Sequence, residues 1–229
     1  MGRIVADIER PAPEIVARFK ALGSSILVRS IESPLIADMA IKPLAVKPTK
    51  ICGPAVTISS SRADLMMGVL ATGVAREGDV VVVCPGGDMT HACWGGGLTL
   101  SADNRGYEAV VVDGAIEDSD YILTLDTPVF CRGATMRKHE LDGRQGSVNV
   151  DVVFGGVPVR PGDLIFGDSD GVLVIPREIL LKVLEKAEPA AEATRQAAPK
   201  LRDSRGVLFD AFGGQALVER LGVEWVSSL

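Results

Sequence analysis

Two acidic residues, Glu117 and Asp118, stand side by side shortly after the β-branched run at residues 109–113. Adjacent carboxylates repel one another unless a cation lies near them. Mg²⁺ is commonly bound through one or two carboxylates and keeps several of its waters. The pair is therefore a candidate metal site. The alternative interpretation is a helix N-terminus, where the helix dipole stabilises acidic residues without any ligand.

Three consecutive glycines, Gly95, Gly96 and Gly97, precede Leu98 at the beginning of a segment with a helical pattern. A glycine-rich helix N-terminus can present backbone N–H groups to a carboxylate or phosphate. The segment is neither a dinucleotide fingerprint nor a phosphate-binding loop, because no Lys-Ser or Lys-Thr pair follows it. An anion cradle and a close crossing of two backbones are both compatible with these glycines.

His91 lies in the polar loop that leads to the glycines. Because histidine titrates near neutral pH, His91 is a candidate general base or metal ligand. The alternative is a loop imidazole that only forms hydrogen bonds with its neighbours. The chain contains no G-x-S-x-G and no H-E-x-x-H motif, so those two classes of hydrolase are not indicated.

The hydrophobic pattern predicts the elements that position these residues. Apolar, β-branched runs predict strands at residues 51–59, 80–84 and 109–113. Helical spacing predicts helices at residues 11–22, 64–75, 92–104 and 118–125. Ligand sites of α/β proteins form where loops leave the carboxyl ends of such strands. We therefore expect any site to lie in the loops that follow the second and third strands.

After residue 127 the pattern changes from alternating helices and strands to short strands alone. Strands are predicted at residues 128–133, 148–154, 157–159, 164–167 and 172–175. Gly155-Gly156 is a hairpin-turn signal between two of them. The pattern predicts a long charged helix at residues 177–198, in which Pro189 can introduce a kink and which Pro199 ends. The tail at residues 201–229 is typical of an element that packs subunits together.

Length and composition favour one domain over residues 1–229, with its core at about 12–176 and a packing helix and tail at 177–229. The net charge of −6 argues against a nucleic-acid partner. The charged beginning of the chain is no signal peptide, and no apolar run is long enough to cross a membrane. Four isolated cysteines indicate reduced thiols, of which Cys52 and Cys84 are expected to be buried. We therefore expect a cytoplasmic protein.

Several sequence segments between about residues 12 and 198 follow the order and spacing of one known protein family. They are ICGPAVT at 51–57, GDV at 78–80, ACWG at 92–95, VVDG at 111–114 with Asp118, PVF at 128–130, and PGD through DSDGV at 161–172. As a set they resemble the RraA-like family, and the long C-terminal helix is similar to its aldolase branch. That branch includes the 4-hydroxy-4-methyl-2-oxoglutarate and 4-carboxy-4-hydroxy-2-oxoadipate aldolases.

The resemblance implies an α/β fold of the swivelling β/β/α type, and homo-trimers or homo-hexamers with active sites between subunits. It also implies Mg²⁺ or Mn²⁺ and cleavage of a small-molecule substrate to pyruvate through an enolate. Asp118 falls on the metal-side aspartate of the family, and Gly95 to Leu98 fall on the turn that holds the pyruvate carboxylate. Asp64 aligns with an acidic position near the site. Glu192 aligns with an acidic residue contributed by a neighbouring subunit.

Two positions depart from the family pattern. The family arginine, which stabilises the developing enolate, falls on Glu117, and an acidic residue of the turn falls on Gly96. Loss of such a donor typically costs about a hundredfold in rate. Glu117 then acts as a ligand or base on a less anionic substrate, or Arg62 or Arg105 replaces the missing cation, or the chemistry is lost, as in the ribonuclease-regulating relatives.

These outcomes leave three hypotheses. The first is a metal-dependent lyase of aldolase or decarboxylase type, in which Glu117, Asp118 and His91 are catalytic and Asp118 and Glu117 hold the metal. The second is a metal-dependent hydrolase or isomerase on a less anionic substrate. The third is an oligomeric regulator without catalysis.

Overall fold

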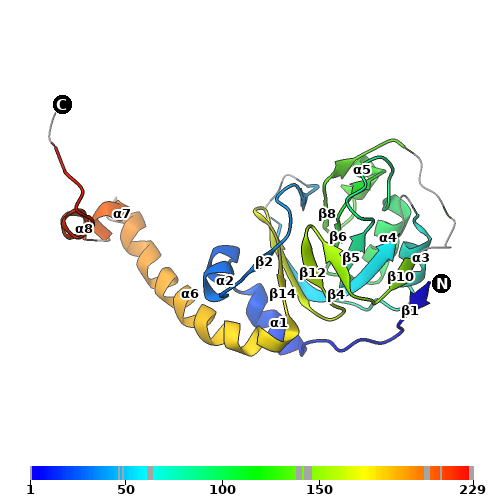
Figure 1. The fold of residues 1–229 in the computed structure, drawn as a ribbon, viewed down its shortest axis with the longest axis horizontal. Coiled ribbons are helices and arrows are strands. Elements are labelled where there is room, and N and C mark those ends of the chain that lie inside the picture. The colour runs from blue at the N-terminus through cyan, green and yellow to red at the C-terminus, as the bar shows by residue number, and fades with distance from the viewer. Residues whose placement is uncertain are drawn as a thin grey trace.

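The apolar runs in the first half of the chain form the parallel part of a curled ten-stranded mixed sheet (Figure 1). The computed structural model describes residues 2–45, 47, 49–60, 64–137, 141, 146–203, 207–211 and 213–226. The parallel strands are β4 (Ile51–Ser60), β5 (Val80–Cys84), β6 (Ala109–Val112) and β8 (Val129–Cys131), adjacent in that order. Their carboxyl ends therefore meet at one edge of the sheet.

Alternation along β5 explains why this strand is apolar at every position. Val81 and Val83 face a core cluster with α3 (Met66–Ala71) and α4 (Gly96–Asn104). Val80 and Val82 face the opposite cluster, which includes the hairpin of β11 (Val152–Phe154) and β12 (Val157–Val159). Successive side chains of a strand point to opposite faces, so a strand buried on both sides is apolar throughout.

Antiparallel strands extend the sheet on the other side of β4. β13 (Leu164–Asp168) pairs with β4 and with β14 (Gly171–Ile175), and β14 pairs with β2 (Leu35–Ile36). The remaining strands are β1 (Arg3–Ile4), β3 (Lys42–Pro43), β10 (Gly146–Val148), and a separate parallel pair of β7 (Ala115–Ile116) and β9 (Gly133–Ala134). A third core cluster joins β13 and β14 to α1 (Pro13–Lys20), α2 (Ser24–Ser30) and α6 (Leu180–Asp203).

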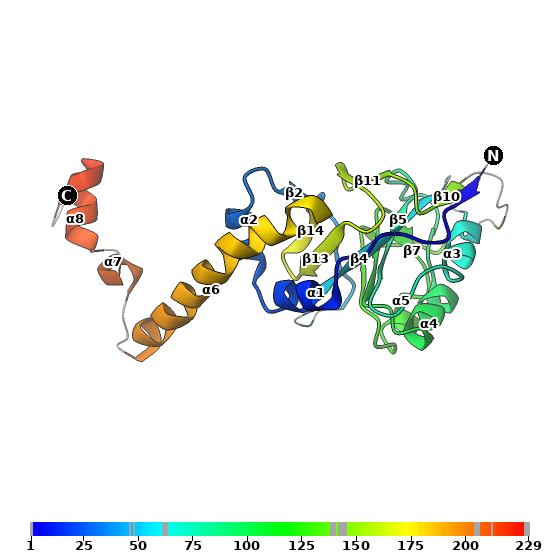
Figure 2. The ribbon, with the colours of Figure 1, turned by 90° about the horizontal axis from the view of Figure 1, so that it is seen from below.

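Helix α6 packs on the body only through its first half. Its buried residues Leu180, Val183, Leu184 and Ala187 follow helical spacing on one face. Beyond them the helix leaves the body, and α7 (Leu208–Ala211) and α8 (Gly214–Leu221) lie at its far end (Figures 1 and 2). The helix continues through Pro199, so the predicted end there is wrong.

Most predicted strands are confirmed with small changes at their ends, and two further predictions need correction. Residues 148–154 form two strands rather than one, because Asn149 takes a left-handed conformation (φ 57°) that breaks an extended chain. The helix predicted at 92–104 begins only at Gly96. All four cysteines are free and buried, as the pattern around Cys52 and Cys84 predicts. In the described part of the chain, no helix has the length and apolar character of a membrane span.

Candidate functional site

A short backbone ladder at the carboxyl edge brings the glycine turn beside the acidic pair. The Cys93 N–H donates to the Ala115 carbonyl, and the Glu117 N–H donates to the Trp94 carbonyl, both at 3.0 Å. Residues 92–94 thus run along β7 instead of beginning a helix, which corrects the sequence-based boundary. The pairing places Gly95 directly beside Glu117 and Asp118, although 22 positions separate Glu117 from Gly95 in the chain.

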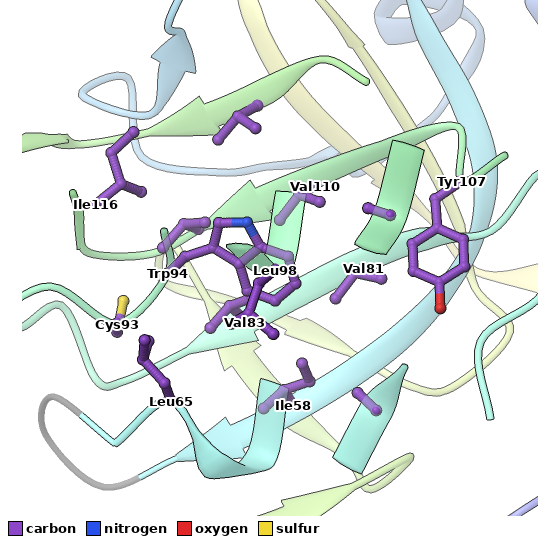
Figure 3. Close-up of a cluster of buried hydrophobic side chains, with 14 of the residues drawn as sticks. Ile58, Leu65, Val81, Val83, Cys93, Trp94, Leu98, Tyr107, Val110 and Ile116 are labelled. Carbon is purple, nitrogen blue, oxygen red and sulfur yellow. The ribbon is translucent and has the colours of Figure 1, made fainter. Parts of the chain in front are cut away.

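Buried side chains on both sides of the turn hold the glycines in place. The indole of Trp94 lies in the same core cluster as Leu98 and Val83 (Figure 3), and its Nε1–H donates to the Thr99 hydroxyl at 2.9 Å. The same Thr99 hydroxyl donates to the Gly95 carbonyl at 3.0 Å. Buried groups that are fully hydrogen-bonded stay in a single arrangement, so the start of α4 is fixed before any ligand arrives.

The two carboxylates converge on Gly95. A Cβ on Gly95 would lie 3.2 Å from Glu117 Oε1 and 3.4 Å from Asp118 Oδ2, so no larger residue fits there without movement. Asp118 takes a left-handed backbone conformation (φ 58°), which is uncommon outside glycine. Left-handed residues of this kind concentrate at functional sites, where the surrounding structure holds them. The geometry therefore draws both acidic side chains toward one point.

Asp118 itself is the anion at the N-terminus of α4. Its Oδ2 accepts the Gly96 N–H at 3.1 Å. The first N–H groups of a helix have no partner within the helix and attract negative charge. The predicted backbone cradle at Gly95 to Leu98 lies at a helix N-terminus, where an aspartate of the same chain contacts it, and its binding of a substrate stays a prediction. Leu98 contributes its backbone there, while its side chain is buried in the core.

Tyr121 belongs to this site and was not expected from the sequence. It lies in α5 (Ser119–Ile122), one turn after Asp118, and its side chain is 47% exposed. A Cβ on Gly96 would lie only 2.7 Å from Tyr121 Cδ1. The aromatic ring thus occupies the space that an acidic side chain at position 96 would need. The signal in the sequence is that Tyr121 follows Asp118 by only three positions, and a Cβ on Gly96 would lie within 3.2 Å of both side chains.

Asp64 and His91 lie in loops that follow β4 and β5. Asp64 is buried, and its Oδ1 accepts the Met66 N–H at 2.9 Å at the beginning of α3. The His91 Nδ1 is 2.9 Å from the Thr90 hydroxyl, which donates in turn to Asp88. Both residues come from the edge that carries the acidic pair. Their contact with a substrate stays a prediction.

Of the two arginines expected to replace the family arginine, Arg62 lies outside the described residues. Arg105 follows the last residue of α4, at the end opposite the glycines. Because a nine-residue helix is about 13 Å long, Arg105 does not reach the start of α4. Glu192 lies on the outer half of α6 and bonds with Gln196 and Arg195. Figures 1 and 2 show this part of α6 apart from the carboxyl edge, so within one copy Glu192 is not a site residue.

A second carboxylate at the same edge has a structural role. Asp113 is buried after β6, accepts Arg132 Nε at 2.6 Å, and accepts the Gly155 N–H at 2.9 Å. Arg132 also donates to Asp38 at 2.7 Å. The Ala40 N–H and the Arg132 guanidinium lower the pKa of Asp38. This cluster ties the β11–β12 hairpin to the sheet edge.

The acidic pair meets the minimum that Mg²⁺ requires of a protein. Among the described residues, no group of three or more His, Cys, Asp or Glu side chains gathers where it could hold a metal. Mg²⁺ does not need such a group, because one or two carboxylates and several waters complete its octahedron. Glu117 and Asp118, whose carboxylate oxygens both lie within 3.4 Å of a Cβ placed on Gly95, fit that donor set.

Comparison with known proteins decides the family. The sequence profile of the RraA-like family, described as Aldolase/RraA, matches residues 28–174, which is more than half of the chain. The chain belongs to the RraA-like family. This RraA-like protein is 36% identical over 175 residues to a protein of Halalkalibacterium halodurans named "Putative 4-hydroxy-4-methyl-2-oxoglutarate aldolase", covering 76% of this chain and 82% of that one.

Two further relatives span even more of the RraA-like protein. An uncharacterized protein of Methanocaldococcus jannaschii is 31% identical over 192 residues, which cover 80% of this chain and 92% of that one. The crystal structure of Streptomyces coelicolor RraAS2, an unusual member of the RNase ES inhibitor RraA protein family, superimposes with a TM-score of 0.71 and 25% identity. That match covers 84% of this chain and 99% of the other. The expected α/β fold is therefore confirmed.

Proposed function

We propose that this RraA-like protein is a divalent-metal-dependent lyase, of aldolase or decarboxylase type, that acts on a small oxo or hydroxy carbonyl compound with Mg²⁺ or Mn²⁺. The observation that carries the proposal is the convergence of the Glu117 and Asp118 carboxylates on Gly95, at the carboxyl edge of the parallel strands. The name of the H. halodurans relative supports the same reaction class.

Asp118 and Glu117 would hold the metal. A divalent cation, when bound, polarises a carbonyl oxygen and stabilises negative charge that develops on it. The N-terminus of α4 orients a carbonyl or carboxylate oxygen through its backbone N–H groups. The Tyr121 ring packs against Gly96 at the same helix N-terminus. Glu117 supplies a proton acceptor or a metal ligand in this arrangement.

Glu117 also sets the class of substrate. An arginine at this position would offer a planar fork that binds a carboxylate through two parallel hydrogen bonds. A glutamate offers acceptors only. We therefore propose a substrate with fewer carboxylates than the oxo-acids of the named aldolases, or one that presents a hydroxyl or carbonyl group at this point. His91 is the second candidate for proton transfer, from the loop after β5.

The test is metal-dependent turnover of oxaloacetate, 4-hydroxy-4-methyl-2-oxoglutarate and a panel of less anionic hydroxy and oxo compounds, with product formation as the readout. Asp118→Asn keeps an oxygen that accepts the Gly96 N–H but removes the charge. We expect its kcat/KM to fall about a hundredfold or more. Asp120→Asn, two residues further along, is the matched control and should stay within about twofold of wild type. Equal activity of Asp118→Asn and wild type would contradict the proposed metal site.

Substitution of Glu117 tests the substrate class separately. Glu117→Arg restores the guanidinium of the family, and Glu117→Gln removes the charge at similar size. We expect Glu117→Arg to shift the ratio of kcat/KM values toward the more anionic oxo-acids by about tenfold or more, and Glu117→Gln to shift it less. An unchanged ratio in Glu117→Arg would mean that residue 117 does not select the substrate.

A regulator without catalysis is the second candidate, favoured by the similarity to the S. coelicolor member of the RNase ES inhibitor family. It predicts no metal-dependent turnover on any compound and no change in Mg²⁺ affinity on Asp118→Asn. Isothermal titration with Mg²⁺ and Mn²⁺ distinguishes the two candidates independently of any substrate. A metal-dependent hydrolase or isomerase would bind metal through the same residues but yield a different product.

A further inference from the structure

The loop that follows β5 is hydrogen-bonded to the segment that leads to the acidic pair. The Gly87 N–H donates to the Asp113 carbonyl at 3.1 Å. The Ala115 N–H donates to the Asp88 carbonyl at 3.4 Å, and two residues later the chain reaches Glu117. Backbone hydrogen bonds of this kind fix the position of a loop, so this one has a defined place beside the candidate site.

Three side chains of this loop are connected by hydrogen bonds. Asp88 Oδ1 accepts the Thr90 N–H at 2.8 Å and the Thr90 hydroxyl at 2.5 Å. The same hydroxyl oxygen lies 2.9 Å from Nδ1 of His91. Asp88 and His91 are both partly buried, whereas Thr90 is exposed. The His91 ring is therefore linked through Thr90 to a carboxylate of the same loop.

The donors and acceptors of these three groups decide which ring nitrogen of His91 carries hydrogen. A carboxylate only accepts hydrogen bonds, and a threonine hydroxyl has one hydrogen to donate. Because Thr90 donates that hydrogen to Asp88, its oxygen can only accept one from His91 Nδ1. A neutral imidazole has a single N–H, so Nε2 keeps its lone pair. Within the part of the chain that the structure describes, no hydrogen bond engages Nε2.

We propose, on the basis of the lyase function proposed above, that Thr90 and Asp88 are positioning residues that hold His91 as the Nδ1–H tautomer and so make Nε2 the proton-transfer atom of the site. In a cleavage of aldol type, Nε2 takes up the proton of the substrate hydroxyl, and the carbon that carried the hydroxyl becomes a carbonyl carbon. The carbon–carbon bond breaks, and its electron pair stays with the carbon beside the original carbonyl group. The imidazolium then returns the proton to that carbon, so the step needs no oxidant and no further reactant.

His91 and Glu117 thereby have separate roles. The Glu117 and Asp118 carboxylates both approach the position of a Cβ on Gly95, and two carboxylates that converge on one point favour a shared cation. His91 comes from a different loop, and its Nε2 carries no charge before it accepts a proton. Once the ring is an imidazolium, the carboxylate linked to it through Thr90 stabilises the positive charge. A proton acceptor that is not a metal ligand stays available when the cation is bound.

The tautomer of His91 is measurable without any substrate. The chain has two histidines, so long-range ¹H–¹⁵N spectra of the protein labelled with ¹⁵N-histidine contain two rings, and His139→Gln shows which signals belong to His91. Above the pH range in which histidine titrates, we expect His91 to give the Nδ1–H pattern. Thr90→Val removes the hydroxyl at similar size and should lose this pattern, whereas Thr90→Ser should keep it.

The same spectra test Asp88. In Asp88→Asn the amide N–H can donate to the Thr90 oxygen, which leaves the hydroxyl hydrogen for Nδ1 of His91 and should populate the Nε2–H tautomer. The matched control is Thr72→Val, which removes a hydroxyl that donates to the Val69 carbonyl at 2.7 Å. This control should leave the pattern of His91 unchanged.

Turnover tests whether Nε2 transfers a proton. His91→Gln should lower kcat about a hundredfold or more, which is the usual contribution of a general base. Thr90→Val should lower kcat about tenfold with KM nearly unchanged, because the ring is kept but is no longer held in one tautomer. Thr90→Ser should restore kcat to within about twofold of wild type, and Thr72→Val should match wild type. Isothermal titration should give the same Mg²⁺ affinity in all of these variants, since Glu117 and Asp118 are unchanged.

The possible outcomes distinguish this proposal from the proposed function. An Nε2–H pattern of His91 in the wild type, or an Nδ1–H pattern that survives in Thr90→Val, would overturn the positioning role of Thr90 and Asp88 even if metal-dependent turnover is found. A tautomer that changes in Thr90→Val without any change in kcat would overturn the role of Nε2 in proton transfer. Absence of both Mg²⁺ binding and turnover in the wild type would contradict the proposed lyase function, and the catalytic role of Nε2 with it.

Discussion

The amino edge and the carboxyl edge of the parallel strands carry carboxylates in opposite situations. At the amino end, Asp79 is 1% exposed and accepts two hydrogen bonds from the Arg10 guanidinium, both at 2.8 Å, and one from the Arg76 N–H. At the carboxyl edge, Asp118 is exposed, left-handed and accepts the Gly96 N–H. A buried carboxylate with several donors stabilises a fold, whereas an exposed one keeps oxygen lone pairs for a ligand.

The contrast extends to what each carboxylate connects. Asp79 joins Arg10, and with it the N-terminal segment, to the loop before β5. Asp118 joins the loop after β6 to the start of α4 at a point where glycine is required. We infer that the amino edge contributes mainly to stability and the carboxyl edge mainly to function.

Removal of Asp79 should have the largest effect on stability. Asp79→Ala leaves the Arg10 guanidinium without its bidentate partner, and such a change typically costs about 3–5 kcal/mol. Urea unfolding followed by fluorescence of the buried Trp94 measures it. Asp7→Ala is the control, because Asp7 is 74% exposed in its ion pair with Arg76 and should contribute less than about 1 kcal/mol. Equal and small losses of unfolding free energy in Asp79→Ala and Asp7→Ala would contradict the proposed difference between the two edges.

Replacement of the glycines at the carboxyl edge should have an intermediate effect. Gly96→Ala forces the Tyr121 ring to move, and overpacking of this kind costs about 1–3 kcal/mol. Gly97→Ala meets nothing within 4 Å and should stabilise α4 by about 0.5 kcal/mol. Tyr121→Ala should reduce the cost of Gly96→Ala in a double-mutant cycle measured by urea unfolding. Additive effects in that cycle would show that the ring does not fill this space.

The pH dependence of stability compares the two regions at alkaline pH. Burial raises the pKa of Cys52 and of Cys93 to about 12 from an ordinary value of 9.0. The stabilising contribution is present below pH 9, where both states are protonated, and is lost as the pH rises toward 12, because the unfolded thiols ionise first. The unfolding free energy should therefore fall from about pH 9 toward pH 12.

Two alanine variants test whether these thiols cause the slope of unfolding free energy against pH in the alkaline range. Cys52→Ala and Cys93→Ala should each make this slope shallower, and an unchanged slope in both variants would contradict the role of these thiols.

Native-state thiol labelling adds to the comparison of the two edges, because Cys52 lies toward the α1 side of the sheet and Cys93 lies under the site. Faster labelling of Cys93 would show that the carboxyl edge opens more readily.

Much of the site was predictable because adjacent parallel strands end at the same edge. The runs VVVVC and AVVV identified β5 and β6, and the loops after them carry the glycines and the acidic pair. The ladder of residues 92–94 along β7 was not predictable, because its partners are about 22 positions away in sequence. The approach of Tyr121 to Gly96 depends on the same long-range pairing.

The sequence by itself determined the buried strands, the family and the residue types available for chemistry, because hydrophobic period and local spacing are properties of the chain alone. Only the tertiary structure decided that Asp118 contacts the start of α4, that Arg105 lies at the wrong end of that helix, and that α7 and α8 stand away from the body. Each of these depends on where distant segments meet, which packing and backbone hydrogen bonding settle together.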